Sequence, residues 1–433
     1  MTDERDNLTE ELVPSENTFD TQSDCNETSA PEETGAEAES VAESAPVQSE
    51  EPDEDPHSFL PANNNKKSMR SWWIKTTLIL VLIVVSIVVM FGITKYIPNG
   101  EQTESLSKLF QDIDTTFLLI LLGVFVFYIL VETSKYAYML KVSTGKFRFR
   151  VSFKTMFLGK YYDGITPMST GGQPFQIYYL HKKNDIPKGA ATAIPLVRYI
   201  VSAFVVTVIS IVLLAITPKL DWEKGVLTTT MYALSWVSIA INCMFPLVII
   251  FFTVFPKKTK RMVAGIISLL AKLHLVKRKY EVMKRWMLEL NEYSKSIKEF
   301  TKKFYQLLPL IFLSALETMI SYSIPFFIVL AIAGTGESAS LLTMDFYVQI
   351  ICLSMLTRYT ALLVPTPGNT GAAEASGILA FSTVAARFPT KISWAVLLWR
   401  FFTYYIYILS GIGINIFEII RSAVRNKRAR KQE

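Results

Sequence analysis

Long apolar runs alternate with basic segments over most of this 433-residue chain. A run of about 20 apolar residues is long enough to cross the ~30 Å hydrocarbon core of a bilayer as a helix. The pattern therefore predicts an all-α polytopic membrane protein with six full spans. We expect the spans at about residues 76–97, 116–140, 190–216, 228–255, 304–333 and 392–420.

Two stretches between these runs do not fit a membrane helix, because they combine glycine, proline and small polar residues. They share the pattern T-P-x-x-T-G, at residues 166–171 and again at residues 366–371. Each copy follows an apolar run that contains Glu-Thr and a tyrosine, and each precedes an arginine in an apolar run. Three features in the same order indicate an internal duplication, which is typical of membrane transport folds. The flanking residues are Glu132, Thr133, Tyr136 and Arg198 in the first copy, and Glu317, Thr318, Tyr322 and Arg400 in the second.

The basic residues between the runs indicate the sides of the membrane, because cytoplasmic loops are rich in Lys and Arg. Basic residues flank the first stretch on both sides, whereas the loop at residues 334–345 before the second stretch has no Lys or Arg. This bias predicts cytoplasmic termini and two re-entrant helical hairpins that open on opposite sides, which form an inverted repeat. A surface loop is the alternative for the first stretch. The basic residues that precede it are Lys141, Lys146, Arg148, Arg150, Lys154 and Lys160.

Charge divides the chain into domains. Residues 1–57 hold 19 of the 38 acidic residues and one of the 44 basic ones, which leaves 43 basic against 19 acidic residues in the remainder. We expect residues 1–65 to be a disordered acidic cytoplasmic tail, since they have too few apolar side chains to form a core. This tail either keeps the chain soluble or folds back on the basic face. Residues 66–425 form the expected transmembrane domain, with an amphipathic basic loop at 257–303 on anionic lipid, and residues 426–433 a basic tail.

The two Thr-Pro pairs suggest an anion site. Threonine is a good helix N-cap and proline suits the first helical position, so we expect each pair to start a half-helix whose free N–H groups face a lipid phosphate. Arginine pairs bidentately with phosphate. The alternative is that Arg198 and Arg400 only pair with acids to hold helices together, and the two roles are compatible. The candidate lipid-binding residues are Asp163, Thr166, Pro167, Thr170, Gly171, Gly172, Gln173, Arg198, Thr366, Pro367, Gly368, Gly371, Glu374 and Arg400, with Glu132, Glu317 and Arg358 as secondary candidates.

Signatures of soluble catalysis are absent from the sequence. It contains no P-loop, no H-E-x-x-H zinc motif and no G-x-S-x-G nucleophile elbow. We therefore expect no catalytic residue, metal or cofactor. We also expect no nucleic-acid partner, because the positive charge of cytoplasmic loops explains the basic segments.

Both special stretches resemble signatures of a known family. Residues 159–180, GKYYDGITPMSTGGQPFQIYYL, resemble the G-x-x-x-N-x-x-x-P-x-x-x-G-G-E signature of the lysylphosphatidylglycerol synthase transmembrane family, also called the flippase-like domain. Residues 362–377, LLVPTPGNTGAAEASG, resemble its second signature, P-x-P-G-G-x-G-x-x-E. The resemblance covers about residues 70–425. It implies a membrane region that, in bifunctional members, moves aminoacylated phosphatidylglycerol between leaflets, while a soluble domain transfers lysine from lysyl-tRNA.

Four positions depart from the family pattern. Asp163 stands in place of Asn, Gln173 in place of Glu and Asn369 in place of Gly, while Val197 precedes Arg198 where an acid is common. The loss of two acids favours an anionic lipid or a polyprenyl-phosphate-linked sugar over a cationic lysyl-lipid. Because the chain ends at Glu433, soon after the last expected span, we also expect no transferase domain.

These observations predict a multi-pass lipid translocase of the bacterial cytoplasmic membrane. Its expected partners are a membrane phospholipid or lipid-linked substrate, with a homodimer as a further candidate. Two alternatives stay open: a membrane component that acts with a separate synthase domain, and a membrane partner of a glycosyltransferase.

Overall fold

The computed structural model describes most of the chain after residue 104. The described residues are 105–166, 169, 171–219, 229–272, 304–384 and 388–429, with isolated positions at 77, 84, 88, 280, 283 and 287. They lie in one compact unit, residues 61–433, and form helices and turns with no strand among them. The acidic tail and nearly all of the first expected span lie outside the described residues.

The described residues contain twelve α-helices. In chain order they are α3 (Leu106–Asp112), α4 (Thr115–Thr144), α5 (Phe149–Ile165), α6 (Gly172–Tyr178), α7 (Lys188–Ile216), α8 (Thr229–Val254), α9 (Pro256–Lys272), α11 (Leu308–Ala333), α12 (Met344–Leu362), α13 (Ala372–Val384), α14 (Ile392–Arg400) and α15 (Ile406–Ala429). Two π-helical turns follow α6 and α14, at Tyr179–Lys183 and Phe401–Tyr405. Short 3-10 turns lie at Thr217–Lys219, Phe304–Gln306 and Pro389–Lys391.

Four segments of the described chain are long and apolar enough to cross a membrane. They are Thr115–Thr144, Lys188–Ile216, Leu308–Ala333 and Pro389–Glu418, and they coincide with the second, third, fifth and sixth expected spans. The fourth expected span coincides with α8, whose apolar section Tyr232–Val248 is shorter. The chain is therefore a multi-pass, helical membrane protein.

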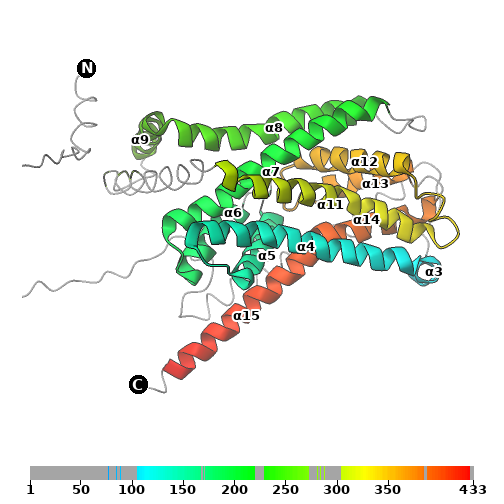
Figure 1. Ribbon diagram of the computed structural model, residues 1–433, viewed down its shortest axis with the longest axis horizontal. Helices are drawn as coiled ribbons and strands as arrows, with labels where there is room; N and C mark the ends of the chain where they lie inside the picture. The colour runs from blue at the N-terminus through cyan, green and yellow to red at the C-terminus, as the bar shows by residue number, and fades with distance from the viewer. Residues whose placement is uncertain are drawn as a thin grey trace, which may run out of the picture. The chain divides into compact units, whose positions relative to one another are not determined.

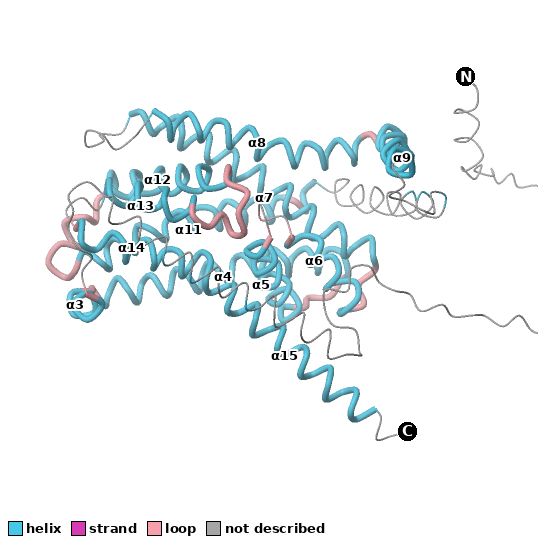
Figure 2. The backbone as a smooth tube through the Cα atoms, turned by 180° about the vertical axis from the view of Figure 1, so that it is seen from behind, coloured by secondary structure: helices cyan, strands magenta, loops and turns pink. Residues whose placement is uncertain are grey.

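Helix α11 is central to the packing. It lies beside α4 and also contacts α7, α12 and α14 (Figures 1 and 2). These contacts bury apolar side chains such as Leu121, Leu310 and Ile328 almost completely, whereas Leu119 and Val126 of α4 are exposed on the opposite face. Since α4 and α11 carry the two Glu-Thr pairs, their contact brings corresponding parts of the two predicted repeats together.

The described residues of the two T-P-x-x-T-G copies share part of their backbone conformation, although Gly171 has a φ of −81° and Gly371 a φ of 89°. Their equivalent fourth residues, Ser169 and Asn369, have φ values of 53° and 54°, in the left-handed region that non-glycine residues seldom occupy. The N–H of Ser169 donates to the carbonyl of Thr166 at 3.3 Å, and the N–H of Asn369 donates to that of Thr366 at 3.0 Å. The first turn joins α5 to α6 and the second joins α12 to α13, and each helix pair packs together. The shared conformation of the fourth residue and the shared hydrogen bond support the predicted duplication.

The prediction that each Thr-Pro pair starts a half-helix is wrong. Thr166 follows the last residue of α5, and the next helix begins only at Gly172; likewise, α13 begins at Ala372. The reason is that both threonine hydroxyls bond inside the turn. Thr166 Oγ1 accepts the N–H of Gly171 at 2.9 Å, and Thr366 Oγ1 donates to the carbonyl of Thr370 at 2.8 Å. Pro167 and the side chain at position 170 lie outside the described residues.

Helices α5 and α15 approach closely at Gly411. A Cβ atom at this position would lie 2.3 Å from Tyr161 Cγ. We expect Gly411→Ala to lower the free energy of unfolding by about 1–3 kcal/mol, because the helices must separate to admit the methyl group. Thermal unfolding in detergent measures this. Gly413→Ala in the same helix, where nothing lies within 4 Å of the added atom, is the control, and an equal loss in both variants would contradict the close contact.

Asp114 ties the start of α4 to the loop after α11. Its carboxylate accepts hydrogen bonds from Ser338 Oγ at 2.9 Å and from the N–H of Thr116 at 3.0 Å. The bond from Ser338, with those from the N–H groups of Phe117 and Thr116, lowers the pKa of Asp114 against the opposing effect of burial. A lowered pKa in the folded state stabilises the protein above the pKa of the unfolded state, and this stabilisation is lost as pH falls through the folded-state value.

We therefore expect Asp114→Asn to unfold at a lower temperature than wild type at neutral pH. The difference should shrink as the pH falls through the acidic range in which Asp114 becomes protonated. Thermal unfolding in detergent at a series of pH values checks this, and a difference that does not change with pH would contradict the role of the charge.

Candidate functional site

A polar cavity of about 390 Å³ lies between the helices that carry the two turns. Side chains from α4, α5, α6, α7, α11, α12 and α14 line it together with residues of both turns. Eight of the candidate lipid-binding residues, primary and secondary, meet here: Glu132, Asp163, Gln173, Arg198, Glu317, Arg358, Gly368 and Arg400. The other described candidates, Thr166, Gly171, Gly172, Thr366, Pro367, Gly371 and Glu374, are not among the lining residues and lie behind it in the turns and at the helix starts.

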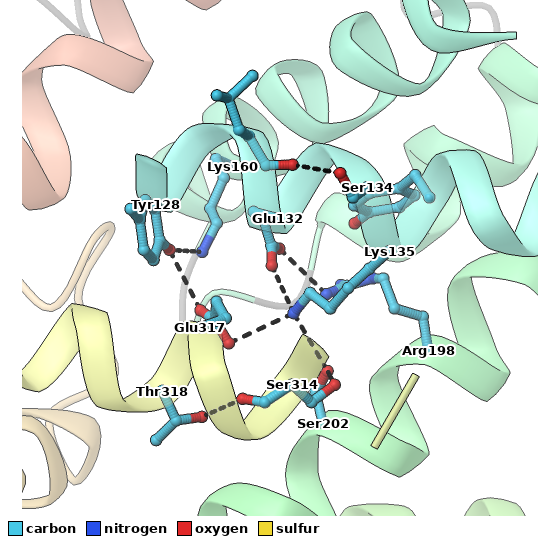
Figure 3. A network of polar contacts seen from close by, with 12 residues as sticks. Tyr128, Glu132, Ser134, Lys135, Lys160, Arg198, Ser202, Ser314, Glu317 and Thr318 are labelled. Carbon is cyan, nitrogen blue, oxygen red and sulfur yellow. Dashed lines mark hydrogen bonds and ion pairs between the residues drawn. The ribbon is translucent and has the colours of Figure 1, made fainter. Parts of the chain in front are cut away.

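A buried ionic network joins the two halves of the duplication (Figure 3). Lys135 of α4, only 1% exposed, forms an ion pair with Glu132 and lies 3.3 Å from Glu317 Oε2 of α11. Arg198 of α7 reaches Glu132 Oε1 at 3.2 Å. The Tyr128 hydroxyl donates to Glu317 Oε1 at 3.3 Å. Buried charges are tolerated when they are paired and hydrogen-bonded in this way.

A second ion pair lies beside the second turn. Arg400 Nε donates to Glu374 Oε1 at 2.8 Å, and its Nη2 donates to the carbonyl of Gly368 at 3.3 Å. The other oxygen of Glu374 accepts the N–H of Gly371 at 2.6 Å, in the manner of the glutamate of a capping box. The pair therefore fixes both the turn and the start of α13.

The first turn has a matching contact. Asp163 Oδ1 accepts the N–H of Gly172 at 2.8 Å, so in each copy an acid holds the backbone N–H at the start of the helix after the turn. Each downstream arginine also lies over a tyrosine ring. The guanidinium carbon of Arg198 is 4.6 Å from the ring centroid of Tyr136, and that of Arg400 is 4.4 Å from that of Tyr404.

The two arginines thus pair with acids, as the helix-holding alternative predicted. Arg198 is bound to Glu132 and Arg400 to Glu374, and both side chains are mostly buried. Glu317, by contrast, pairs with Lys135 rather than with an arginine. Binding of lipid phosphate by these arginines stays a prediction.

Several residues of the cavity are not among the candidates predicted from the sequence. Lys135 lies three residues after Glu132, a spacing that places both on one helix face, so this pair had a readable signal. Lys160 stands among the basic residues that the sequence places in the cytoplasm, but in the structure it lines the cavity. The side-chain amide of Gln176 donates to the hydroxyl of Tyr136 at 2.7 Å. This position could not be predicted from the sequence, because the side chain fits only where Gly159 of α5 leaves room for it. Within the described part of the chain, no His, Cys, Asp and Glu side chains gather closely enough to hold a metal ion.

The fold and the cavity define a class: a multi-pass helical membrane protein with a polar, charge-lined cavity among its helices. Residues 67–411 match the family model described as the lysylphosphatidylglycerol synthase TM region. The match spans most of the chain, so the chain belongs to this family, and the resemblance seen in the two signatures is confirmed. Searches of curated proteins and of solved structures gave no match.

Proposed function

We propose that the chain is a flippase-like lipid translocase. In this proposal the cavity binds the headgroup of an anionic phospholipid, an aminoacyl-phosphatidylglycerol or a polyprenyl-phosphate-linked lipid. The supporting observation is that both turns and five basic side chains line one cavity inside an apolar helical domain. Its volume of about 390 Å³ lies within the range of roughly 300–1,000 Å³ that small-molecule sites have.

The duplication suggests how the lipid moves. We take α5/α6 and α12/α13 to be re-entrant hairpins of opposite orientation in a bacterial cytoplasmic membrane, with both termini in the cytoplasm. Transporters with inverted repeats open a central site to one side at a time by rocking one repeat against the other. Movement of one hairpin against the other would expose the cavity to each leaflet in turn while the acyl chains stay in the bilayer.

Filling the cavity should stop the movement of lipid. Ala361 is buried and lines the cavity, so Ala361→Trp places a large side chain inside it. We expect purified wild-type protein in liposomes to move labelled phosphatidylglycerol between leaflets, and this variant to do so only at the rate of protein-free liposomes.

The control for this test is Gly123→Trp. Gly123 lies on an exposed face of α4 with nothing within 4 Å of an added Cβ atom, so this variant should behave as wild type. Wild type that moves none of the candidate lipids would contradict the translocase proposal.

The family description favours a second candidate, a membrane component that acts with a lysylphosphatidylglycerol synthase. If the lipid carries a sugar, the corresponding candidate is a membrane partner of a glycosyltransferase. Co-expression with the synthase or the glycosyltransferase distinguishes these two candidates from a translocase that acts alone. Either partnership requires co-purification with a synthase or glycosyltransferase and a modified lipid that disappears when the chain is deleted.

A further inference from the structure

Two basic side chains of the cavity have no carboxylate within ion-pair distance among the described residues. Arg358 of α12 forms no ion pair or hydrogen bond there, although its neighbours Thr357 and Tyr359 are buried. Lys160 of α5 donates to the Tyr128 hydroxyl at 3.0 Å but meets no described carboxylate within ion-pair distance. The other three basic residues of the cavity, Lys135, Arg198 and Arg400, are all paired.

Arg358 is exposed to the cavity. Ser354, Arg358, Ala361 and Leu362 all line it, and their spacing of four and three residues places them on one face of α12. The guanidinium therefore presents its N–H donors to the cavity inside a membrane domain. An intramembrane charge of this kind is costly, and its default interpretation is functional.

A third donor is available beside Lys160. Tyr407 is 4% exposed and lines the cavity, and its hydroxyl has no hydrogen-bond partner among the described residues. The Nζ of Lys160 lies 5.9 Å from the centroid of the same ring. A buried hydroxyl without a partner loses the hydrogen bonds it makes in water, so a ligand oxygen that approaches Lys160 would satisfy it.

The charges around the cavity leave a positive excess of one. The basic residues that line it are Lys135, Lys160, Arg198, Arg358 and Arg400, and the acids that line it or pair with these residues are Glu132, Asp163, Glu317 and Glu374. A single phosphodiester, which carries one negative charge, would bring the sum to zero. A lysyl-lipid carries a net positive charge and would raise the excess.

Protein cations already lie over three of the tyrosine rings that line the cavity and over Tyr128 beside it. Because cations bind well over the faces of tyrosine rings, these four rings are less available to a cationic headgroup. Arg198 covers Tyr136, Arg400 covers Tyr404, and Lys160 lies over both Tyr128 and Tyr407.

We propose that Arg358, Lys160 and the Tyr407 hydroxyl form the phosphate subsite of the cavity, and that the ligand is a lipid with one phosphodiester and no net positive charge. This inference rests on the proposed function and narrows its substrate class. Asp163 lines the same cavity without a described basic partner in ion-pair range, and it accepts hydrogen bonds from headgroup hydroxyls, as a glycerol headgroup offers. Arg198 then holds α7 to α4, and Arg400 fixes the second turn, while neither binds the lipid.

The test is the binding of short-chain phosphatidylglycerol to the full-length protein in detergent, measured by calorimetric titration. We expect Arg358→Gln and Lys160→Gln each to weaken binding by about tenfold or more, as expected for the loss of a charge-assisted hydrogen bond, without a lower unfolding temperature. Arg358→Lys should retain part of the affinity. Lys141→Gln, which changes an exposed lysine at the end of α4, is the matched control and should bind as wild type.

A second binding experiment compares lipids of different charge. Wild type should bind short-chain phosphatidylglycerol about tenfold or more tightly than its lysyl ester, because the ester adds positive charge to a cavity that already carries an excess. Tighter binding of the lysyl ester, or unchanged affinity in Arg358→Gln, would overturn the subsite. Binding as predicted without movement in liposomes would leave the subsite standing and overturn the translocase instead.

Discussion

Replacing Lys135 by glutamine is expected to destabilise the protein by about 3–5 kcal/mol, the cost of breaking a buried ion pair by removing one partner. Lys135 is almost fully buried and pairs with Glu132 on its own helix and with Glu317 on α11. Its loss leaves Glu317 with the Tyr128 hydroxyl and leaves Glu132 with Arg198 alone. The measurement is the free energy of unfolding in detergent, with protein yield as a second readout.

A rescue variant separates lost charge pairing from lost packing. The double variant Lys135→Gln with Glu317→Gln also removes the charge of Glu317, the acid that loses its ion-pair partner. Glu132 still pairs with Arg198. We expect the double variant to recover most of the stability, since neutral replacement of both partners is far less costly than an unpaired charge. A double variant as unstable as the single one would show that Lys135 acts through its shape alone.

Replacing Arg400 by glutamine is expected to lower the free energy of unfolding by a similar amount, about 3–5 kcal/mol. Glu374 has no exposed surface, and the change removes the guanidinium that pairs with it. The change also removes the bond from Arg400 to the Gly368 carbonyl, which helps to fix the second turn. Thermal unfolding in detergent measures the loss.

The matched rescue is Arg400→Gln with Glu374→Gln. A glutamine at position 374 still accepts the N–H of Gly371, because glutamine replaces glutamate in capping boxes. We expect this pair of changes to fold nearly as well as wild type and to preserve the start of α13. No recovery would mean that the hydrogen bond to Gly368, and not the ion pair, is the main contribution.

Four of the six expected spans and the positions of the two turns could be predicted from the sequence, because both depend on local pattern. Hydropathy located α4, α7 and α11 within a few residues of their observed ends, since an apolar run of this length fits a bilayer only as a helix. The two T-P-x-x-T-G copies marked the turns that share one backbone conformation at Ser169 and Asn369.

The place of Lys160 in the cavity and the contact of Lys135 with Glu317 could not be predicted in the same way. Lys160 lies in a run of basic residues that resembles a cytoplasmic loop, and only packing places it in the cavity. Lys135 and Glu317 are 182 residues apart in the chain, so their contact depends on α4 and α11 lying side by side. The prediction that each Thr-Pro pair starts a half-helix was wrong because proline and threonine fit a turn as well as a helix start.

The charges of the cavity therefore fall into two groups with different expected phenotypes. Lys135, Arg198 and Arg400 are paired and are expected to affect stability when changed. Arg358 and Lys160 have no described acid partner, and they are expected to affect lipid binding and movement with little effect on folding.

The most direct measurement of this account is an experimental structure of the full-length protein in nanodiscs of phosphatidylglycerol. The account predicts headgroup density in the cavity, with the phosphate in hydrogen-bonding distance of Arg358 and Lys160 and with the Glu132–Arg198 and Glu374–Arg400 pairs intact. A phosphate bound to Arg198 or Arg400 in place of its acid, or a cavity that holds no lipid while lipid is still moved, would contradict it.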